Sequence, residues 1–358
     1  MSTRYPGNAT RGIVTAKPAA ADGEGGALTP NALSFRVLRL LADGEFHSGE
    51  ALARQLKVTR TTVWKALQGL ESWGVTLFKV NGRGYRLVTP IDWLDVQAVR
   101  TSLGARAHGF QVEIVDAIGS TNTVLLNEAL AGAPNGLVVA AELQTQGRGR
   151  RGRTWHTGLG GALTFSLLWR FEHGVGALGG LSLAVSVALL RTMRDLDLQD
   201  VAVKWPNDLL WRHRKLAGIL TEIEGDVSGP SAAIIGIGVN MRLPDLVKDR
   251  IDQAVTDLSS AGVEVTRSEL LGRLLGHLAD VLGSFNARGF GALRDEWDAA
   301  HVLHGRTVAV SASGQPDETG VVAGVAEDGA LLLRAGTAVR RYYSGEISVR
   351  PGEALRRA

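Results

Sequence analysis

The spacing of apolar residues changes twice along this 358-residue chain, and these changes divide it into parts of different structure. Residues 33–90 carry apolar residues at helical spacing, strand-like and helical runs alternate from 91 to about 286, and short alternating strands follow Trp297. A chain of this length can hold two or three domains with cores of their own. We therefore expect a disordered tail over 1–32 and folded domains over 33–90, 91–300 and 301–358.

The first folded domain has the pattern of a winged helix-turn-helix. Ser48 can cap a helix that buries Ala51, Leu52 and Leu56, and Thr59 can cap the next, with a core face of Val63, Leu67 and Leu70. About three residues separate these two helices, which is helix-turn-helix spacing. Two strands follow at 76–80 and 85–88, and Asn81-Gly82 between them favours a tight hairpin, the wing.

Charge supports a role for this domain in binding DNA. Residues 33–90 hold nine Lys/Arg and four acids, a net charge of +5, whereas the whole chain carries +3. Donor-rich side chains on the third helix and the hairpin suit phosphates and base edges. The predicted DNA-binding residues are Arg60, Thr61, Thr62, Lys65, Gln68, Lys79 and Arg83. The alternative is a solvated three-helix interaction module.

The rest of the chain predicts an α+β protein. In the middle domain we expect a mixed α/β fold with about six strands, at 112–117, 137–142, 162–169, 201–205, 216–224 and 232–238, and helices at 123–131, 178–196 and 267–285. Five short strands between 307 and 349, with turns at Ser313-Gly314 and Asp328-Gly329, predict a small C-terminal barrel.

A glycine–arginine loop spans Gly147 to Arg153 and is followed by Trp155. It satisfies the G-x-G-x-x-G pattern, but a loop and a strand follow it rather than a helix, which argues against dinucleotide binding. Four arginines with no acid nearby should repel one another and become ordered around a phosphate or carboxylate. Nonspecific contact with nucleic acid is the alternative.

Two further segments carry polar chemistry. The chain has only 7 lysines among its 39 basic residues, and Lys204 ends a strand before Trp205-Pro206-Asn207-Asp208, where it can offer charge to an oxyanion or phosphate. It could instead pair with a surface acid. Ser120-Thr121-Asn122 stands between a strand and a helix, where it can cap the helix or grip a polar head group.

Several classes of function are excluded or disfavoured. The chain has no cysteine, which excludes a disulfide framework, a thiol nucleophile and a cysteine-ligated metal. It has no Walker A loop, no G-x-S-x-G elbow and no H-E-x-x-H, no metal site is predicted, and His301 and His304 are expected at the surface. The longest uncharged run, 174–190, is too short to span a membrane, so we expect a cytoplasmic protein with no membrane partner.

In this order, the motifs resemble those of the biotin–protein ligases, specifically the bifunctional biotin operon repressor/ligases. The resemblance extends from about 33 to 351 and rests on Ser120 to Asn122, the loop at 147–153, Lys204 to Asp208, Lys215 to Gly218 and Gly238 to Asn240. It implies a central domain like the catalytic domains of class II aminoacyl-tRNA synthetases and an SH3-like C-terminal barrel.

The resemblance also implies an ATP-dependent, AMP-forming biotin–[acetyl-CoA-carboxylase] ligase. Biotin and ATP with Mg²⁺ would form biotinyl-5′-adenylate, and a lysine of a biotin carboxyl carrier protein would then accept the biotinyl group. The adenylate would act as corepressor, favouring a homodimer that binds operator DNA and represses biotin-synthesis genes. A ligand-sensing regulator with little ligase activity, or a lipoate or other acyl ligase of the same fold, are the alternatives.

Site residues follow by matching motifs. The resemblance implies that Ser120, Thr121 and Asn122, with Gln144, hold the ureido end of biotin. Arg148, Gly149 and Arg150 would bind the carboxylate and phosphate, and Arg148, Arg150 and Lys204 would be the catalytic residues. The adenylate-binding set is completed by Asn207, Lys215, Gly218 and Asn240.

Overall fold

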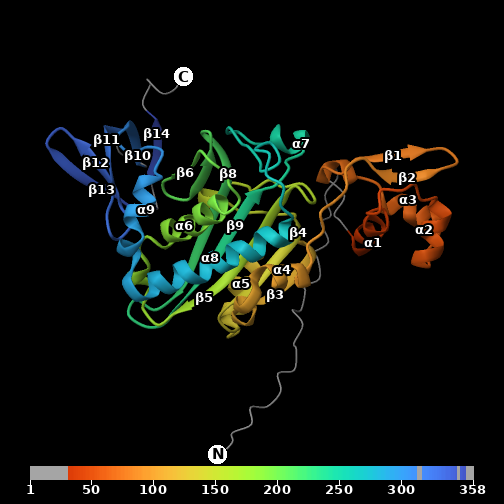
Figure 1. Ribbon diagram of the computed structural model, residues 1–358, viewed down its shortest axis with the longest axis horizontal. Helices are drawn as coiled ribbons and strands as arrows, with labels where there is room; N and C mark the ends of the chain where they lie inside the picture. Colours follow the sequence, from red (N-terminus) through yellow and green to blue (C-terminus); the bar gives the residue numbers. More distant parts are fainter. Residues whose placement is uncertain (1–30, 313–316, 345–346, 352–358) are drawn as a thin grey trace, which may run out of the picture.

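The computed structural model describes residues 31–312, 317–344 and 347–351. The N-terminal domain lies at one end of the long axis and the C-terminal sheet toward the other, with the large sheet between them (Figure 1). Most of the predicted tail falls outside the described residues, but α1 begins at Ala32, inside the range assigned to the tail. Within the described ranges, no helix has the length and apolar character to cross a membrane.

The N-terminal domain has the predicted helix-turn-helix and hairpin. Ser48 and Thr59 cap their helices through their side chains, as expected. Ala51 is exposed and Ala53 is buried in its place, while Leu67 and Leu70 are in the core although the third helix ends before them. The elements are α1 (Ala32–Leu40), α2 (Gly49–Leu56), α3 (Arg60–Ala66), η1 (Leu70–Trp73), β1 (Leu77–Val80) and β2 (Gly84–Leu87).

The central domain is built on a mixed sheet, which has seven strands in the described part in the order β3-β4-β5-β9-β8-β7-β6. The strands are β3 (Gln111–Ile118), β4 (Leu137–Gln144), β5 (Ala162–Phe171), β6 (Val201–Lys204), β7 (Asp208–Trp211), β8 (Arg214–Gly225) and β9 (Ser231–Asn240). The sequence predicted six of them. It missed β7, because Asp208 was assigned to a turn, whereas it opens a strand that pairs with Lys204 of β6.

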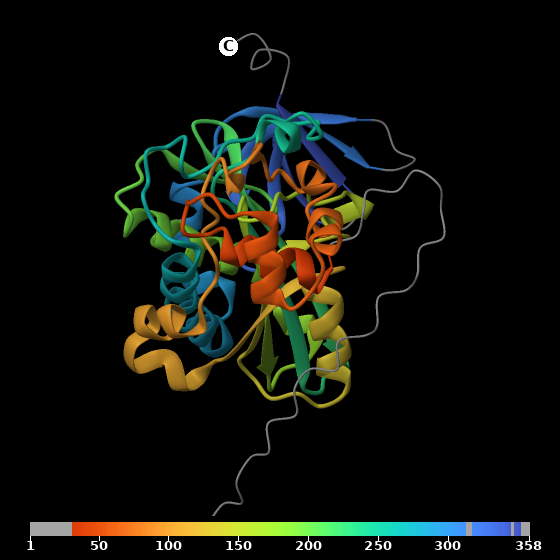
Figure 2. The same ribbon diagram turned by 90° about the vertical axis from the view of Figure 1, so that its right-hand side faces the viewer.

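Helices cover both faces of this sheet (Figure 2). On one face, α4 (Val96–Leu103), α6 (Leu181–Arg194) and α8 (Arg267–Arg288) bury the main core, and on the other α5 (Thr121–Leu130) packs through Leu125 against Val139 and Ile234. The helix predicted at 178–196 begins at Leu181, because Gly180 takes a left-handed conformation (φ 80°). Shorter helices are η2 (Gly104–Gly109), η3 (Arg150–Gly152), η4 (Val175–Leu178), α7 (Asp245–Lys248), η5 (Phe290–Ala292) and α9 (Arg294–Ala299).

The C-terminal domain contains an antiparallel sheet that has five strands among the described residues, as predicted, in the order β13-β12-β11-β10-β14. They are β10 (Thr307–Ala312), β11 (Glu318–Val325), β12 (Leu331–Ala335), β13 (Ala338–Tyr342) and β14 (Ile347–Pro351). The predicted turn Ser313-Gly314 lies outside the described residues. The turn at Asp328-Gly329 is present, and the Gly329 carbonyl accepts a hydrogen bond of 3.0 Å from the Trp205 indole.

The expectation for the two C-terminal histidines was right for one and wrong for the other. The His304 side chain is about half exposed. His301 is 5% exposed, its ring lies 4.5 Å from that of Trp297, and neither ring nitrogen has a hydrogen-bond partner among the described residues. Burial lowers the pKa of His301 to about 3. The sequence did not show this, because the chain around His301 is held in place by a parallel bridge to Val203 of β6, which is distant in the chain.

The N-terminal domain packs against the central domain, and in the end-on view of Figure 2 it lies in front of the large sheet. Its core takes in Leu143 of β4 and Leu159, and Arg39 forms an ion pair of 2.5 Å with Asp116 of β3. The segment between β2 and α4, which links the two domains, is anchored as well: buried Arg267 hydrogen-bonds to Asp92 of this linker and to the buried Glu142 carboxylate at 2.5 Å. The helix-turn-helix therefore adjoins the strands that lead into the site described next.

Candidate functional site

A cavity of about 530 Å³ opens where the β3–α5 turn, the glycine–arginine loop and strands β8 and β9 meet. This volume is typical of sites for small organic ligands. Eleven of the residues predicted from the sequence line it: Ser120, Thr121, Asn122, Gln144, Arg148, Gly149, Arg150, Lys204, Asn207, Lys215 and Gly218. They come from segments up to 98 positions apart, so the fold brings the separate motifs together.

Ser120 is the N-cap residue of α5, but its side chain makes no capping hydrogen bond. The capping alternative for the Ser-Thr-Asn triplet therefore has no support in the described geometry. Ser120 is mostly buried and lines the cavity, so its hydroxyl is available to donate to or accept from a ligand.

Thr121 and Asn122 belong to a continuous hydrogen-bond network. The Gln144 Oε1 accepts from the Thr121 backbone N at 2.8 Å, and the Thr121 and Ser166 hydroxyls are 2.7 Å apart. The Ser166 hydroxyl donates to Asn122 Oδ1 at 2.5 Å, and Asn122 Nδ2 donates to Glu222 Oε2 at 2.7 Å. A network with this many buried members fixes side-chain orientation and makes one end of the cavity a rigid polar surface.

Two glycines of β9 make room for this arrangement. A Cβ on Gly236 would lie 2.1 Å from Asn122 Oδ1, and a Cβ on Gly238 would lie 2.4 Å from the Trp155 ring. Glycine inside a strand often marks a site where another group approaches the backbone closely. Gly236 lies outside the motifs that predicted the site, although its alternation with Gly238 along the strand is a signal of such an approach.

The glycine–arginine loop closes on itself through two backbone hydrogen bonds, Gly149 N to Arg153 O at 2.7 Å and Trp155 N to Gly147 O at 2.9 Å. Arg148 forms an ion pair of 3.0 Å with Glu222. Arg150 points toward Asn207 and hydrogen-bonds to the Ser344 carbonyl, and its burial lowers its pKa. The loop is thus connected to both β8 and the C-terminal domain.

The two lysines of the cavity differ in their partners. Lys215 forms an ion pair of 2.7 Å with Asp208 and lies 5.6 Å from the centre of the Trp155 ring. Lys204 has no carboxylate within 4.0 Å in the part of the chain that the structure describes, so the alternative of a surface ion pair has no support there. The cavity lining contains six Lys/Arg and two Asp, Asp208 and Asp252, which favours an anionic ligand.

Asn240 differs from its expected position, because it does not line the cavity. It is buried at the end of β9, where Nδ2 donates to the carbonyl oxygens of Thr256 at 2.9 Å and Lys215 at 3.3 Å. Asn240 therefore holds the 252–257 segment beside the cavity, and Asp252 and Gln253 of this segment are part of the lining. The sequence also missed Ser166 and Glu222, which carry no local motif.

A divalent cation has few protein ligands here. Among the residues described, no three His, Asp or Glu side chains are grouped so that they could hold a metal ion. Asp208 faces the cavity but is paired with Lys215. Mg²⁺ commonly enters such sites bound to substrate phosphates with one or two carboxylates, and the cavity fits that mode better than a preformed protein cage.

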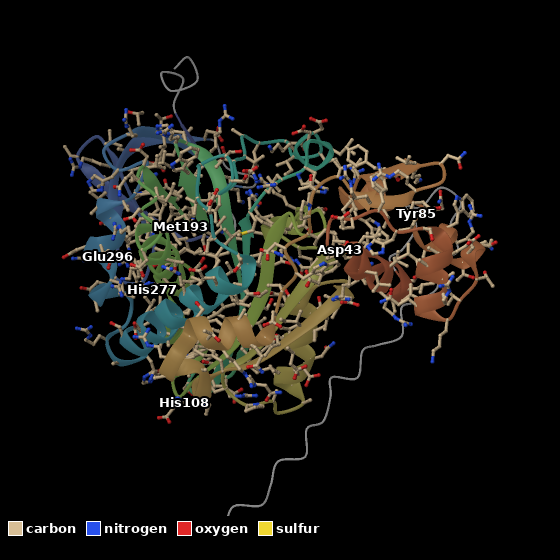
Figure 3. All side chains as sticks on the ribbon, turned by 45° about the vertical axis from the view of Figure 1, so that its right-hand side comes forward. Asp43, Tyr85, His108, Met193, His277 and Glu296 are labelled. Atoms are coloured by element: carbon tan, nitrogen blue, oxygen red, sulfur yellow. The ribbon has the colours of Figure 1, made fainter. Side chains whose placement is uncertain are left out.

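The residues predicted to bind DNA lie on the N-terminal domain, on the side of the molecule opposite Glu296 (Figure 3). Arg60, Thr61, Lys65, Lys79 and Arg83 are exposed on α3 and the hairpin. Thr62 is half-buried with its hydroxyl 2.8 Å from that of Thr59, and Gln68 donates to the Trp64 carbonyl, so these two are partly engaged.

The wing contains a further feature that the sequence did not reveal. The guanidinium groups of Arg83 and Arg86 lie over the Phe46 ring, at 4.4 and 4.8 Å from its centre. Phe46 precedes α2, and His47 next to it pairs with Tyr85 of β2 through two backbone hydrogen bonds of 2.9 Å. The hairpin is therefore attached to the helical part by a backbone bridge and a stacked pair of arginines.

Three known family models match separate parts of this chain. The Biotin/lipoate A/B protein ligase family matches residues 114–240, which contain most of the cavity. An HTH domain matches 34–86, and a Biotin protein ligase C terminal domain matches 303–350. The order of the three matches is the order of the three folded parts.

Whole-length relatives are similar as well. The bifunctional ligase/repressor BirA of Salmonella typhimurium is 37% identical over 88% of this chain and 97% of its own length. The bifunctional ligase/repressor BirA of Escherichia coli is 35% identical over 90% of this chain and 99% of its own length. Among solved structures, the biotin protein ligase of Aquifex aeolicus in complex with biotin and ATP is 26% identical, with a TM-score of 0.57, over 68% of this chain and 99% of that one.

Proposed function

Because the chain belongs to the biotin protein ligases of the bifunctional ligase/repressor type, we propose that it activates biotin with ATP and transfers the biotinyl group to a lysine of a biotin carboxyl carrier protein. In the first step a biotin carboxylate oxygen attacks the α-phosphorus of ATP, and pyrophosphate leaves. In the second, the carrier lysine amine attacks the acyl carbon and loses a proton, and AMP leaves as the amide forms.

One observation carries this proposal: a rigid polar end and a cationic end share one cavity. The neutral network of Thr121, Ser166 and Asn122 suits a small uncharged head group with donors and acceptors, as in the ureido ring. The arginine loop and Lys204 suit the carboxylate and the α-phosphate, whose mutual repulsion opposes the first step. Preorganised cations lower that barrier by holding the two anions together and stabilising the charge that develops.

The site residues have distinct proposed roles. Ser120 contacts the ureido group, and Thr121, Asn122 and Gln144 shape its pocket. Arg148, Gly149 and Arg150 bind the carboxylate and phosphate oxygens, and Lys204 stabilises the charge on the acyl phosphate. Asn207 braces the turn before β7 through its bond of 2.8 Å to the Ile219 carbonyl, while Lys215 and Gly218 border the nucleotide side. Mg²⁺ would supply further charge neutralisation while bound to the phosphates.

Biotin-dependent exchange of pyrophosphate into ATP tests the ligase proposal. The purified protein should catalyse exchange with biotin and not with lipoate. Exchange with lipoate or another acyl acid in place of biotin would replace the proposed substrate, and no exchange with any acid would favour a ligand-sensing regulator. The family model that matches 114–240 includes lipoate ligases, so lipoate is the informative comparison.

We further propose that the adenylate-bound protein forms a homodimer and represses biotin-synthesis genes as a cytoplasmic regulator. The free side of β8 supports a dimer, since β7 pairs with β8 only up to Gly218 and leaves the stretch from Thr221 to Gly225 without a neighbour on that side among the described strands. Gel-shift and sedimentation experiments with DNA from upstream of biotin-synthesis genes should show tighter binding and a dimer when biotinyl-adenylate is present. Equal binding without the adenylate would contradict a corepressor role.

Finer features of the fold belong to the same proposal. We propose a resemblance of the central domain to class II aminoacyl-tRNA synthetases and of the C-terminal sheet to SH3-like barrels, with domain boundaries at 90/91 and 300/301. Helices on both faces of a mixed sheet and a five-stranded antiparallel sheet among the described residues are compatible with these assignments.

A further inference from the structure

Glu222 of β8 connects the two ends of the cavity. Its Oε2 accepts hydrogen bonds from Asn122 Nδ2 at 2.7 Å and from Arg148 Nη2 at 3.0 Å, and its Oε1 lies 3.1 Å from the same guanidinium nitrogen. The side chain is 28% exposed. One carboxylate thus binds a residue of the polar head-group end and a residue of the arginine loop.

The orientation of Asn122 depends on this carboxylate. Asn122 Nδ2 donates to Glu222 and, at 3.2 Å, to the Leu220 carbonyl, while Oδ1 accepts from Ser166. A carboxylate is an acceptor only, so it requires the NH₂ group of the amide on its side. Without the carboxylate, the Asn122 amide can turn over so that Oδ1 no longer faces Ser166. The hydroxyls of Ser166 and Thr121 would then lose the acceptor that orients them.

The ion pair between Glu222 and Arg148, unlike the hydrogen bond to Asn122, can be replaced by a contact between Arg148 and a ligand. The Arg148 side chain is 45% exposed, and ion pairs at such exposure contribute little to stability because solvent screens them. A ligand carboxylate or phosphate in the cavity offers the guanidinium a bidentate partner of greater charge. Glu222 can therefore hold Arg148 while the site is empty and release it when an anion arrives.

We propose that Glu222 is a positioning residue: it fixes the Asn122 amide for the head group and holds Arg148 at the cavity until the acyl or phosphate group takes its place. This inference rests on the proposed biotin adenylation, but its loop component can be tested without ligand. A merely structural ion pair on β8 would predict no specific effect on either biotin affinity or the loop.

Two substitutions of Glu222 separate its effect on Asn122 from its effect on Arg148. Glu222→Gln retains an acceptor for Asn122 but removes the charge that holds Arg148, whereas Glu222→Ala removes both. Glu224→Gln is the matched control, because Glu224 lies two residues further on the same strand and face, is exposed, and has no ion pair among the described residues.

The experiment measures biotin dissociation constants by calorimetry and tryptic cleavage after Arg150 in the full-length protein. We expect biotin affinity about tenfold weaker in Glu222→Ala and within about twofold of wild type in Glu222→Gln and Glu224→Gln. In the empty protein, cleavage should be several-fold faster in both Glu222 variants and unchanged in Glu224→Gln. With biotin and ATP bound, Glu222→Gln should be as protected as wild type.

Three outcomes would overturn the proposal: Glu222→Ala binds biotin as tightly as Glu224→Gln, Glu222→Gln leaves cleavage of the empty loop unchanged, or Glu222→Gln still accelerates cleavage in an Arg148→Ala background. The third comparison works even where Glu222→Ala folds poorly, because both of its variants keep a polar residue at position 222. If the wild-type protein did not bind biotin, the proposed function would fail, while the cleavage comparison in the empty protein would still decide the role of Glu222 toward Arg148.

Discussion

Lys204 and Lys215 share a cavity, but their charges are not equally available. Lys215 is paired with Asp208, whereas Lys204 has no carboxylate partner in the described ranges. A cation that is not neutralised can act fully on charge developing on a ligand, and loss of one such group commonly costs 10²- to 10³-fold in rate. We expect Lys204→Ala to slow biotin-dependent pyrophosphate exchange by about that factor. Lys79→Ala, on the wing, should leave exchange unchanged; comparable rates in both variants would exclude the assigned role.

Gly236 offers a test of the close packing beneath the polar end of the cavity. A methyl group at this position would lie 2.1 Å from Asn122 Oδ1, so Gly236→Ala must displace the amide or the strand. We expect at least tenfold weaker biotin binding by calorimetry. Gly283→Ala in α8 is the control, because nothing lies within 4 Å of its added methyl group and alanine favours the helix. Normal biotin affinity in Gly236→Ala would show that Asn122 is not needed in its present position.

The sequence predicted those cavity residues that belong to contiguous motifs of unusual composition. Lys204 stood out because lysine is rare here, and the arginine loop because four arginines share seven positions. Glu222 and Ser166 are ordinary residues of ordinary strands, and only the pairing of β8 and β5 with β9 brings them to Asn122. Asn240 is the opposite case: it ends the motif that begins at Gly238, yet its Nδ2 donates to two backbone carbonyls and it does not line the cavity.

The wing is the element whose position depends most on a few side chains. Phe46 stacks against both Arg83 and Arg86, and each such contact is worth about 0.5–1 kcal/mol at an exposed site. We expect Phe46→Leu to release the hairpin and weaken DNA binding several-fold in gel shifts, without changing pyrophosphate exchange. Phe78→Leu should have a smaller effect, since Phe78 stacks with Arg86 but not with Arg83. A Phe46→Leu protein that binds DNA like wild type would show that the stack does not order the wing.

Helices and strands were predictable where capping residues and apolar spacing agree with the burial seen in the structure. Ser48 and Thr59 are capping residues whose side chains do cap, and the long apolar strands of the sheet were found close to their true ends. β7 escaped because it is four residues long and begins with Asp208, a residue typical of turns, and its strand conformation depends on pairing with β6 and β8. Tertiary pairing thus overrode local preference at the point where the chain leaves Lys204.

At the scale of the whole molecule, the contacts between domains had no signature in the sequence. Arg39 and Asp116 are 77 residues apart and form an ion pair, and Arg267 anchors Asp92 of the linker from a distance of 175 residues. The composition showed a basic N-terminal domain but not that it packs on β3 and β4, two strands that lead into the cavity. The domains could therefore be counted from the sequence, while their mutual arrangement required the structure.

His301 provides a test of how burial at the start of the C-terminal domain affects the stability of the molecule. Its pKa is about 3 in the folded protein and 6.5 for the unperturbed group, so between these values the unfolded chain binds more protons. Stability from the neutral ring is therefore fully present above pH 6.5 and is lost as the pH falls, by about 1.4 kcal/mol at pH 5.5 from this group alone. His301→Leu should remove this part of the pH dependence, measured as the difference in urea unfolding between pH 7.5 and 5.5. His213→Asn, at an exposed position far from His301 in the chain, should keep the wild-type dependence, and Asp298, whose pKa burial raises, is present in both variants. An unchanged pH dependence in His301→Leu would mean that this ring is protonated or solvated in the folded protein.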